Sequence, residues 1–455
     1  MARLFGTDGV RGIANKTLTA KLAYEIGFAA AIVLAKCHEK KDNKPVFLIG
    51  SDTRISCRML EAALESGILS AGADVIKVGV IPTPGVAYLT TKYVCDAGVM
   101  ISASHNSYEY NGIKLFSSDG FKLADNVEDE IEEIITNFDS MNFALPEGDK
   151  LGSSIFKADA ASEYIEHLKR RMSVDLSGMK LAIDCANGSA SAYAPKLFED
   201  LGATVVVTDN KPNGLNINKN CGSTHLGNLI DLTVSHSCDM GLAFDGDADR
   251  FLAIDNNGKV IDGDVIMSIV ALDMKKHQEL KKDTLVITVM SNLGVQIMSR
   301  ENDLNLATTK VGDRYVLEEM LKSGYNLGGE QSGHVILLDH ATTGDGMLTA
   351  LALLKSIYRN KTTLSNASLV VAILPQVLLP AYVRDEDKET VMNDSDITSK
   401  IEAINMSLGN EGRVLVRPSG TEPMIRVMLE GKDLDNITAL AKELVDLISS
   451  KYSEK

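Results

Sequence analysis

Three aspartates stand at alternate positions in the segment 244–250, which reads Phe-Asp-Gly-Asp-Ala-Asp-Arg. Apolar runs at 240–244 and 251–254 flank it, so the sequence predicts two strands joined by a tight loop. In such a loop the carboxylates can converge, and they would raise each other's pKa unless a cation lies among them. Oxygen ligands in this number suit Mg²⁺, which keeps other positions for water or phosphate. We therefore expect a magnesium site at Asp245, Asp247 and Asp249, completed by a phosphate oxygen.

Two other interpretations of these aspartates are weaker. A solvated acidic turn would not need the apolar flanks, which bury the base of the loop. An EF-hand calcium loop also begins with alternating aspartates, but its required glycine would fall on Arg250 and its closing glutamate on Asn256. The EF-hand is therefore rejected, and the acidic turn stays the alternative.

A serine is the first candidate to carry that phosphate. The apolar run 97–103 predicts a buried strand that ends at Ser104 and His105. Ligands of parallel α/β sheets bind beyond the carboxyl ends of strands. A serine there can be a nucleophile, a phosphate contact or only a turn residue, and spacing alone favours the turn. The need for a phosphate on the metal, with Lys114 close by in sequence, favours a functional Ser104.

The segment 417–423, Arg-Pro-Ser-Gly-Thr-Glu-Pro, is a second candidate for binding an anion. Its first proline and its glycine fix a tight loop, in which backbone N–H groups, two hydroxyls and a guanidinium can surround a phosphate. An ordinary hairpin turn is the alternative, but it needs neither two hydroxyls nor an arginine. The predicted phosphate ligands are Arg417, Ser419, Gly420, Thr421 and, in support, Arg426.

Three further segments carry weaker patterns. Glu330 and Ser332 alternate in the Gly-rich segment 328–334, so both can face the same way and bind sugar hydroxyls; a Gly-rich turn with a surface glutamate is an equal alternative. The segment 310–314 can simply be a charged loop. The segment 4–12 is Gly-rich and carries Arg11, so we expect a loop that approaches a ligand closely, or one that only precedes a helix.

A strand–helix–strand pattern occurs three times and must position these residues. The first copy covers 46–80, the second 179–208 and the third 284–309, each with short loops. The pattern predicts an α/β fold with three similar domains of parallel or mixed sheets, followed by a smaller α+β domain. A length of 455 residues agrees with three or four domains. The expected boundaries are 1–152, 153–255, 256–368 and 369–455.

Composition narrows the classes of function. Apolar content of 45% and charged content of 24% are ordinary for a globular chain, while the net charge of −16 argues against nucleic acid or an anionic membrane as a partner. The six cysteines form no C-x-x-C pair, which favours reduced thiols. The first residues form no signal peptide, and the apolar runs are too short to span a bilayer. We expect a cytoplasmic protein.

These motifs together resemble the α-D-phosphohexomutase family over essentially the whole chain. Ser-His-Asn at 104–106, the acidic loop at 245–250, the loop at 329–334 and the loop at 417–423 occur in the family's order. The resemblance implies three related α/β domains and a smaller fourth around a cleft. It also implies a phosphoserine enzyme in which the sugar passes through a bisphosphate. The catalytic residues that it implies are Ser104, Lys114 for proton transfer, and His105 and Arg11 in support. The implied metal ligands are Ser104, Asp245, Asp247 and Asp249. The implied sugar contacts are Glu330, Gln331, Ser332, His334 and Arg250.

Two features are similar to the family members that interconvert glucosamine 6-phosphate and glucosamine 1-phosphate. They are the opening Phe-Gly-Thr-Asp-Gly-Val-Arg-Gly at 5–12 and Gln331. This resemblance implies Mg²⁺ as cofactor, glucosamine 1,6-bisphosphate as intermediate, a phosphorylated hexosamine as substrate, a homodimer, and a role in supplying UDP-N-acetylglucosamine for the bacterial cell wall. The chain departs from the family's usual residues at Cys57, Ser107 and Tyr110, which bears on loop rigidity and turnover.

Three rival functions follow from the same residues. A phosphomannomutase or phosphoglucomutase would keep the serine and metal chemistry and differ in its sugar contacts. A Mg²⁺-dependent phosphatase also uses acidic loops, but it would not need the 417–423 loop for a second phosphate. A non-catalytic phosphosugar-binding regulator would be favoured by loss of the serine or of an aspartate, and neither is lost.

Overall fold

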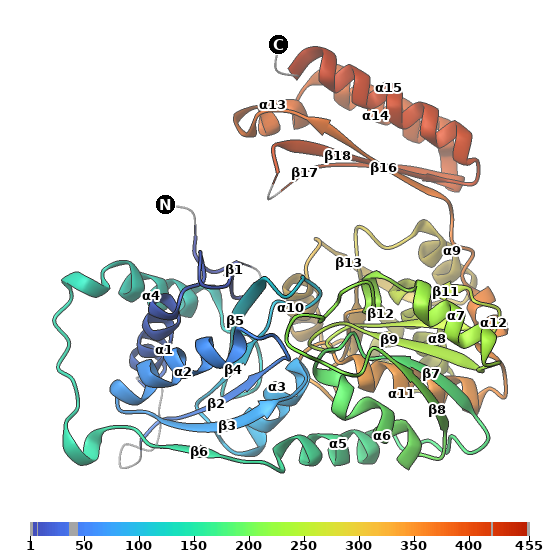
Figure 1. Cartoon of the computed structure of the whole chain (residues 1–455). Helices are drawn as coiled ribbons and strands as arrows, with labels where there is room; N and C mark the ends of the chain where they lie inside the picture. Colours follow the sequence, from blue (N-terminus) through green and yellow to red (C-terminus); the bar gives the residue numbers. More distant parts are fainter. Residues whose placement is uncertain (1–2, 7, 36–43, 420–421, 453–455) are drawn as a thin grey trace. The chain divides into compact units, whose positions relative to one another are not determined.

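The computed structural model describes residues 3–6, 8–35, 44–419 and 422–452. It divides into two compact units, which are described separately (Figure 1). The first unit contains the chain up to residue 290 together with 304–370, and the second contains 291–303 together with the chain from 371 on.

The first sheet of the first unit has six strands in the order β1-β5-β4-β2-β3-β6. Its strands are β1 (Val10–Ile13), β2 (Val46–Ser51), β3 (Asp74–Val80), β4 (Ala97–Ile101), β5 (Tyr110–Ser117) and β6 (Ser154–Phe156). β2 lies parallel to β3 and β4, whereas β5 runs antiparallel to β4 and β1. The sheet is therefore mixed, and the antiparallel β5 returns the chain from the end of β4.

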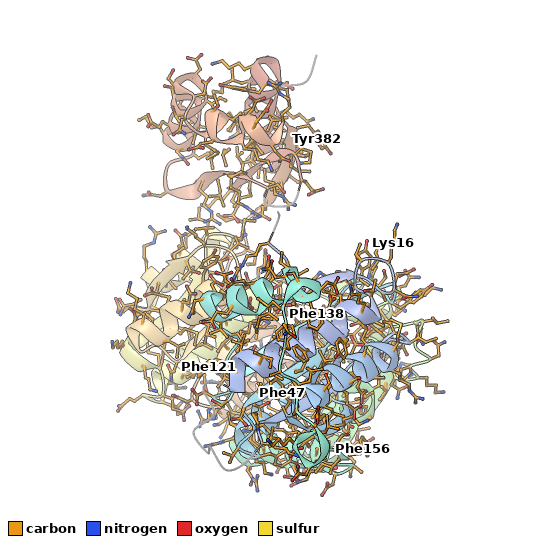
Figure 2. All side chains as sticks on the ribbon, turned by 90° about the vertical axis from the view of Figure 1, so that its left-hand side faces the viewer. Lys16, Phe47, Phe121, Phe138, Phe156 and Tyr382 are labelled. Carbon is orange, nitrogen blue, oxygen red and sulfur yellow. The ribbon has the colours of Figure 1, made fainter. Side chains whose placement is uncertain are left out.

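Helices cover both faces of this sheet. The helices α1 (Ala20–Ala35), α2 (Cys57–Ser70) and α4 (Asp125–Thr136) share one apolar core with the strands. On the other face α3 (Thr83–Lys92) approaches closely at Gly98, where a Cβ would lie 2.2 Å from Thr90 Oγ1. Burial on both faces explains why the central strands read as continuous apolar runs. Phe47 on β2 is accordingly buried, whereas Phe156 on the edge strand β6 is exposed (Figure 2).

The second sheet has the order β11-β10-β9-β7-β8. Its strands are β7 (Lys180–Asp184), β8 (Thr204–Thr208), β9 (Met240–Phe244), β10 (Phe251–Asp255) and β11 (Val260–Ile261), and the helices of this region are α5 (Ala160–Arg171), α6 (Ala194–Asp200) and α7 (Gly227–Ser235). β9 and β10 form an antiparallel pair in which Phe244 lies opposite Phe251. The predicted strand–loop–strand around the aspartates is confirmed.

The third sheet has the order β13-β12-β14-β15. Its strands are β12 (Thr284–Thr288), β13 (Asn305–Thr309), β14 (Leu327–Gly329) and β15 (Val335–Leu337), and the helices of this region are α8 (Gly263–Lys276), α10 (Asp313–Ser323), α11 (Gly346–Arg359) and α12 (Leu364–Ala367). β12 and β13 are parallel, as the third copy of the pattern predicts. The short β14 and β15 form the antiparallel pair that carries the Gly-rich segment 328–334.

The second unit is a three-stranded antiparallel sheet with helices packed on it. Its elements are β16 (Gln376–Tyr382), β17 (Gly412–Pro418), β18 (Met424–Gly431), α9 (Leu293–Glu301), α13 (Lys388–Met392), α14 (Ser395–Leu408) and α15 (Leu434–Tyr452). The fully buried carboxylate of Glu430 accepts bonds from Leu293 N at 3.0 Å and Arg413 Nε at 2.6 Å. These bonds tie the start of α9 to the C-terminal sheet, although the sequence pattern of α9 belongs to the third repeat.

The fold class is confirmed as three α/β domains and a smaller α+β unit, but one local prediction is wrong. Arg11 lies in strand β1 and not in a loop, because residues 10–13 pair with 110–113 and complete the edge of the first sheet. The error arises from long-range strand pairing, which a local sequence pattern does not report.

Two compositional expectations can be compared with the structure. Within the described ranges, no helix has the length and apolarity needed to cross a bilayer. The five described cysteines, at 57, 95, 185, 221 and 238, are buried free thiols, and Cys37 lies outside the described residues.

Candidate active site

The β9–β10 connection brings three buried carboxylates together. Ligand atoms of Asp245, Asp247 and Asp249 all lie within 4.8 Å of one another, and we refer to these residues as the metal cluster. The connection is tight because Ala248 takes a φ of 55° and its N–H donates to Asp245 O at 3.1 Å. A small side chain tolerates that turn best. The predicted convergence of the aspartates is therefore present.

The metal cluster retains carboxylate oxygens that accept no hydrogen bond from the described residues. Asp247 Oδ1 and Asp249 Oδ1 are buried and have no hydrogen-bond partner among the described residues. Buried carboxylate oxygens without a partner are costly, so such atoms indicate an absent ligand. Two free oxygens beside a third carboxylate fit a hard cation such as Mg²⁺. The donor set is thus consistent with the predicted metal.

Burial and mutual repulsion set the electrostatics of the metal cluster. Burial, together with Asp249 and Asp247, raises the pKa of Asp245 well above its usual range. Burial would also raise the pKa of Asp249, but the neighbouring Lys114 ammonium and His334 lower it. The cluster therefore holds more negative charge than a buried site favours, which a cation would offset.

Ser104 lies directly beside the metal cluster. Its side chain is buried, and its hydroxyl donates to Asp245 Oδ2 at 2.7 Å. The same oxygen lies 3.3 Å from His105 Nδ1. Ser104 has a φ of 51°, a left-handed conformation that is uncommon for residues other than glycine. The hydroxyl predicted to carry phosphate is therefore next to the predicted metal ligands.

Lys114 is buried among three carboxylates. Its Nζ lies 2.8 Å from Asp247 Oδ2, 3.1 Å from Asp8 Oδ2 and 3.6 Å from Asp249 Oδ2. Burial would lower the pKa of Lys114, but Asp247 and Asp8 raise it, so the side chain is an ammonium ion. Burial, Arg250 and Arg11 instead lower the pKa of His105 to about 4, so its imidazole is neutral at pH 7. The two groups beside the cluster thus carry different protonation states.

A cleft of about 410 Å³ opens next to the metal cluster. Its lining comes from the N-terminal segment, the metal loop and the third sheet: Arg3, Leu4, Gly6, Asp8, Gly9, Arg11, Asp249, Arg250, Val311, Gly312, Asp313, Glu330 and His334. Both acidic and basic groups line it, and its size suits one sugar phosphate. Four predicted residues outside the metal cluster meet here: Arg11, Arg250, Glu330 and His334.

The predicted sugar loop is only partly directed at this cleft. Glu330 Oε1 accepts from Gly312 N at 2.9 Å, and His334 lies with Nδ1 3.6 Å from Asp249 Oδ2. Gln331 instead donates to Asp262 Oδ2 at 3.1 Å, where Asp262 caps helix α8. Ser332 is exposed to solvent. Gln331 and Ser332 are therefore not among the residues that line the described cleft, because the loop turns onto the start of α8 after Glu330.

The predicted phosphate loop lies in the second unit. Arg417 on β17 pairs across the sheet with Arg426 on β18. Burial and the Arg426 charge lower the pKa of Arg417. Ser419 is buried and its carbonyl accepts from Lys388 Nζ at 2.6 Å. Gly420 and Thr421 lie outside the described residues. Arg426 Nη2 donates to Glu422 Oε2 at 2.9 Å, so one of the two guanidinium groups is paired with a carboxylate, and phosphate binding by this loop stays a prediction.

Several residues of the site were not identified from the sequence. Thr83 donates to Asp247 Oδ2 at 2.6 Å, Asn218 donates to Ser104 O at 2.9 Å, and Arg54 donates to the same carbonyl at 2.9 Å. Asp8 binds Lys114 and also Lys122, at 2.6 Å. Arg54 and Asp8 had local signs, since Arg54 belongs to a loop after a buried strand and Asp8 to the motif at 5–12; Thr83 and Asn218 had none.

Comparison with known proteins gives the class of this chain. Four models of the family described as phosphoglucomutase/phosphomannomutase match it: alpha/beta/alpha domain I at residues 2–141, domain II at 162–258, domain III at 262–371 and the C-terminal domain at 381–447. Together they cover most of the 455 residues. The chain therefore belongs to the phosphoglucomutase/phosphomannomutase family.

Three individual proteins are similar to this chain over nearly its whole length. A curated protein of Clostridium acetobutylicum named phosphoglucosamine mutase is 54% identical over 99% of this chain and 100% of its own length. The crystal structure of a phosphoglucomutase/phosphomannomutase family protein from Burkholderia thailandensis matches with a TM-score of 0.83 at 22% identity, over 99% of this chain and 98% of that one. N-acetylphosphoglucosamine mutase of Aspergillus fumigatus, in complex with GlcNAc-6P and magnesium, matches with a TM-score of 0.67 at 16% identity, over 99% and 96%. The likeness to these two structures shows that this chain shares their fold.

Proposed function

We propose that this chain interconverts glucosamine 6-phosphate and glucosamine 1-phosphate through a phosphorylated Ser104. One observation carries the proposal: the Ser104 hydroxyl lies 2.7 Å from Asp245, within a cluster of three buried carboxylates that has two unused oxygens. A serine that only stabilised a turn would not need that surrounding. The choice of an amino sugar is supported by the name of the 54% identical relative.

Asp245, Asp247 and Asp249 would hold Mg²⁺ together with an oxygen on Ser104. When bound, the metal would offset the negative charge of the phosphoryl group and favour its transfer. Lys114 and Arg250 contribute further positive charge beside the cluster, at 2.8 Å from Asp247 Oδ2 and at 3.9 Å from Asp249 Oδ1. Such groups stabilise a transferring phosphoryl group.

The transfer exchanges one P–O bond for another. The bond from phosphorus to Ser104 Oγ breaks, a bond to the attacking sugar hydroxyl oxygen forms, and one proton moves from that hydroxyl to Ser104 Oγ. We assign this proton transfer to Lys114, whose ammonium gives a proton to the departing Ser104 Oγ and takes one back from the attacking hydroxyl. His105, with Nδ1 3.3 Å from Ser104 Oγ, and Arg11 support the exchange. The product of this half is glucosamine 1,6-bisphosphate, and the reverse exchange at its other phosphate returns the phosphoryl group to Ser104.

The sugar contacts are assigned to the cleft and to the loop at its edge. Glu330, His334 and Arg250 are proposed to bind the sugar within the cleft. Gln331 and Ser332 stay predictions, with Gln331 acting through Asp262 in the described conformation. Arg417, Ser419, Gly420, Thr421 and Arg426 are proposed to bind the phosphate that is not being transferred. The boundaries 1–152, 153–255, 256–368 and 369–455, the homodimer and the cytoplasmic location also stay predictions.

A side-by-side assay tests the proposal. The purified chain would receive Mg²⁺, a trace of sugar bisphosphate, and glucosamine, mannose or glucose 6-phosphate in separate reactions. We expect the highest kcat/KM on the amino sugar. Higher activity on mannose or glucose 6-phosphate would mean that the proposed substrate is wrong and the proposed mechanism still holds. Release of inorganic phosphate without isomerisation would favour a phosphatase. Binding of all three sugars without turnover would favour the regulator.

A further inference from the structure

A buried arginine holds the backbone of the serine loop. Arg54 is only 2% exposed, although an arginine is seldom buried to this degree without several partners. Its Nη2 donates to Ser104 O at 2.9 Å and to Asn106 O at 2.8 Å, and its Nη1 donates to Ser107 O. One planar guanidinium thus binds three carbonyls of the segment 104–107. The rigid geometry of the guanidinium allows this, and a lysine ammonium cannot reproduce it.

The arginine is itself fixed by a second set of contacts. Arg54 Nε and N donate to the two oxygens of Asp52, both at 2.9 Å. Asp52 Oδ2 also accepts from Ser102 Oγ at 2.6 Å, and Ser102 Oγ accepts from Ser104 N at 3.0 Å. Ser104 is therefore held through its carbonyl by Arg54 and through its N–H by Ser102. Both bonds lead back to the same carboxylate.

Asn218, from the region of the second sheet, also binds two of these carbonyls. Asn218 Nδ2 donates to Ser104 O and to Asn106 O, at 2.9 Å in each case. Each of these carbonyls thus accepts one bond from Arg54 and one from Asn218. Gly246 of the metal loop lies against this contact, since a Cβ there would lie 2.6 Å from Ser104 O. The loop at 245–250 and the segment 104–107 are therefore in close contact.

These contacts surround a residue in an unfavourable backbone conformation. A non-glycine residue with a φ of 51° persists only where its surroundings determine it strongly. The hydroxyl faces Asp245 in that conformation. We propose that Arg54, together with Asn218, is a positioning residue that holds Ser104 in this conformation so that its oxygen stays aligned with the metal cluster. The inference rests on the proposed function of Ser104.

The conservative variant Arg54→Lys is the main test. It keeps a buried cation near Asp52 but cannot bind three carbonyls at once. A misplacement of about 1 Å in a reacting group can lower the rate about 100-fold, so we expect kcat to fall by about that factor while KM changes by less than about threefold. In a single turnover, transfer from phosphorylated Ser104 to the sugar should slow by the same factor. Arg359→Lys, at a half-buried arginine that ends α11 and binds Asp273 and Glu279, is the matched control, and we expect unchanged rates.

Asn218→Ala gives an independent measurement if Arg54→Lys does not fold. It removes two hydrogen bonds at the edge of the loop, and we expect kcat to fall about tenfold, with the melting temperature within a few degrees of wild type. A normal kcat in either folded variant, or a raised KM with a normal kcat, would overturn the inference. An inactive wild-type chain would instead refute the proposed function, so the two failures are distinguishable.

Discussion

Two groups of potential metal ligands lie in the second sheet's region, and they differ in how their oxygens are used. The metal cluster, Asp245, Asp247 and Asp249, follows β9, while Asp184, Asp209 and Cys221 form a second group near the ends of β7 and β8. We refer to the second group as the capping cluster. Both are gathered within 4.8 Å, so proximity alone does not distinguish them.

The capping cluster is satisfied by the protein itself. Asp184 Oδ1 accepts from Ala186 N and Oδ2 from Gly222 N, both at 2.8 Å. Asp209 accepts from Asn187 Nδ2 at 3.2 Å and from Thr208 Oγ1 at 2.8 Å. Every carboxylate oxygen of this cluster has a donor, whereas the metal cluster leaves two oxygens without one. The number of gathered acids therefore does not distinguish the two clusters, whereas the unused carboxylate oxygens of the metal cluster do.

The largest expected difference between the clusters concerns the serine that only the metal cluster contacts. Ser104→Ala removes the oxygen that would accept the phosphoryl group, so mutase activity should fall by at least about 1000-fold. The melting temperature should change little, because the lost hydroxyl makes one hydrogen bond to Asp245. Coupled enzyme assays and calorimetry would measure both quantities. Ser191→Ala, at a buried serine hydroxyl without a partner in the described chain, is the control. Normal turnover of Ser104→Ala would contradict the phosphoserine mechanism.

Removing one carboxylate from each cluster tests which of the two clusters binds Mg²⁺. Asp249→Asn should weaken Mg²⁺ binding in calorimetric titration and lower activity about 100-fold, since it replaces a ligand that has a free oxygen with a neutral amide. Asp184→Asn should leave the Mg²⁺ affinity within about twofold of wild type, because its oxygens serve backbone N–H groups. Equal loss of Mg²⁺ affinity in both variants would mean that the free oxygens do not mark the metal site.

Local spacing made much of the metal cluster predictable. Three aspartates within five residues, between two apolar runs, must converge if the runs pair as strands, and they do. The repeated strand–helix–strand pattern likewise predicted the sheets, because burial of both faces imposes continuous apolar strands. Ser104 could be predicted as a strand-end residue, and its contact with Asp245 then required only that two sheet edges meet.

The rest of the site depends on contacts that no local pattern contains. Thr83 reaches Asp247 across 164 residues of sequence, and Asn218 reaches Ser104 across 114. Arg11 was expected in a loop, but pairing with β5 draws it into a strand. Gln331 stays a predicted sugar contact, and no sequence pattern indicated that its amide would donate to Asp262, which caps α8. Single residues of this kind carry no periodicity, so their partners follow only from the tertiary structure.

The smallest expected difference concerns the pH dependence of stability. Burial raises the pKa of Asp184 from its usual value near 3.8 to about 7, although the N–H groups of Ala186 and Gly222 oppose the shift. The folded chain then binds a proton at Asp184 more tightly than the unfolded chain does. Stability from this group is therefore full below about pH 4 and is lost as pH rises to about 7, by at most about 1.4 kcal/mol per pH unit.

The asparagine in Asp184→Asn cannot ionise, so this variant should lose the pH dependence of stability that Asp184 contributes. Melting temperatures of wild type and variant would be compared at pH 5 and pH 8 with a chelator present, so that Mg²⁺ binding does not contribute. We expect the wild type to lose a few degrees relative to the variant between the two pH values, because 1 kcal/mol corresponds to about 2–4 °C in a chain of about 150–250 residues and to less in a longer chain. Asp149→Asn, at an exposed carboxylate, should follow the wild type. A difference between wild type and Asp184→Asn that is the same at both pH values would mean that Asp184 is ionised in the folded chain, as a ligand would be, and the capping cluster would then have to be treated as a second candidate for a cation.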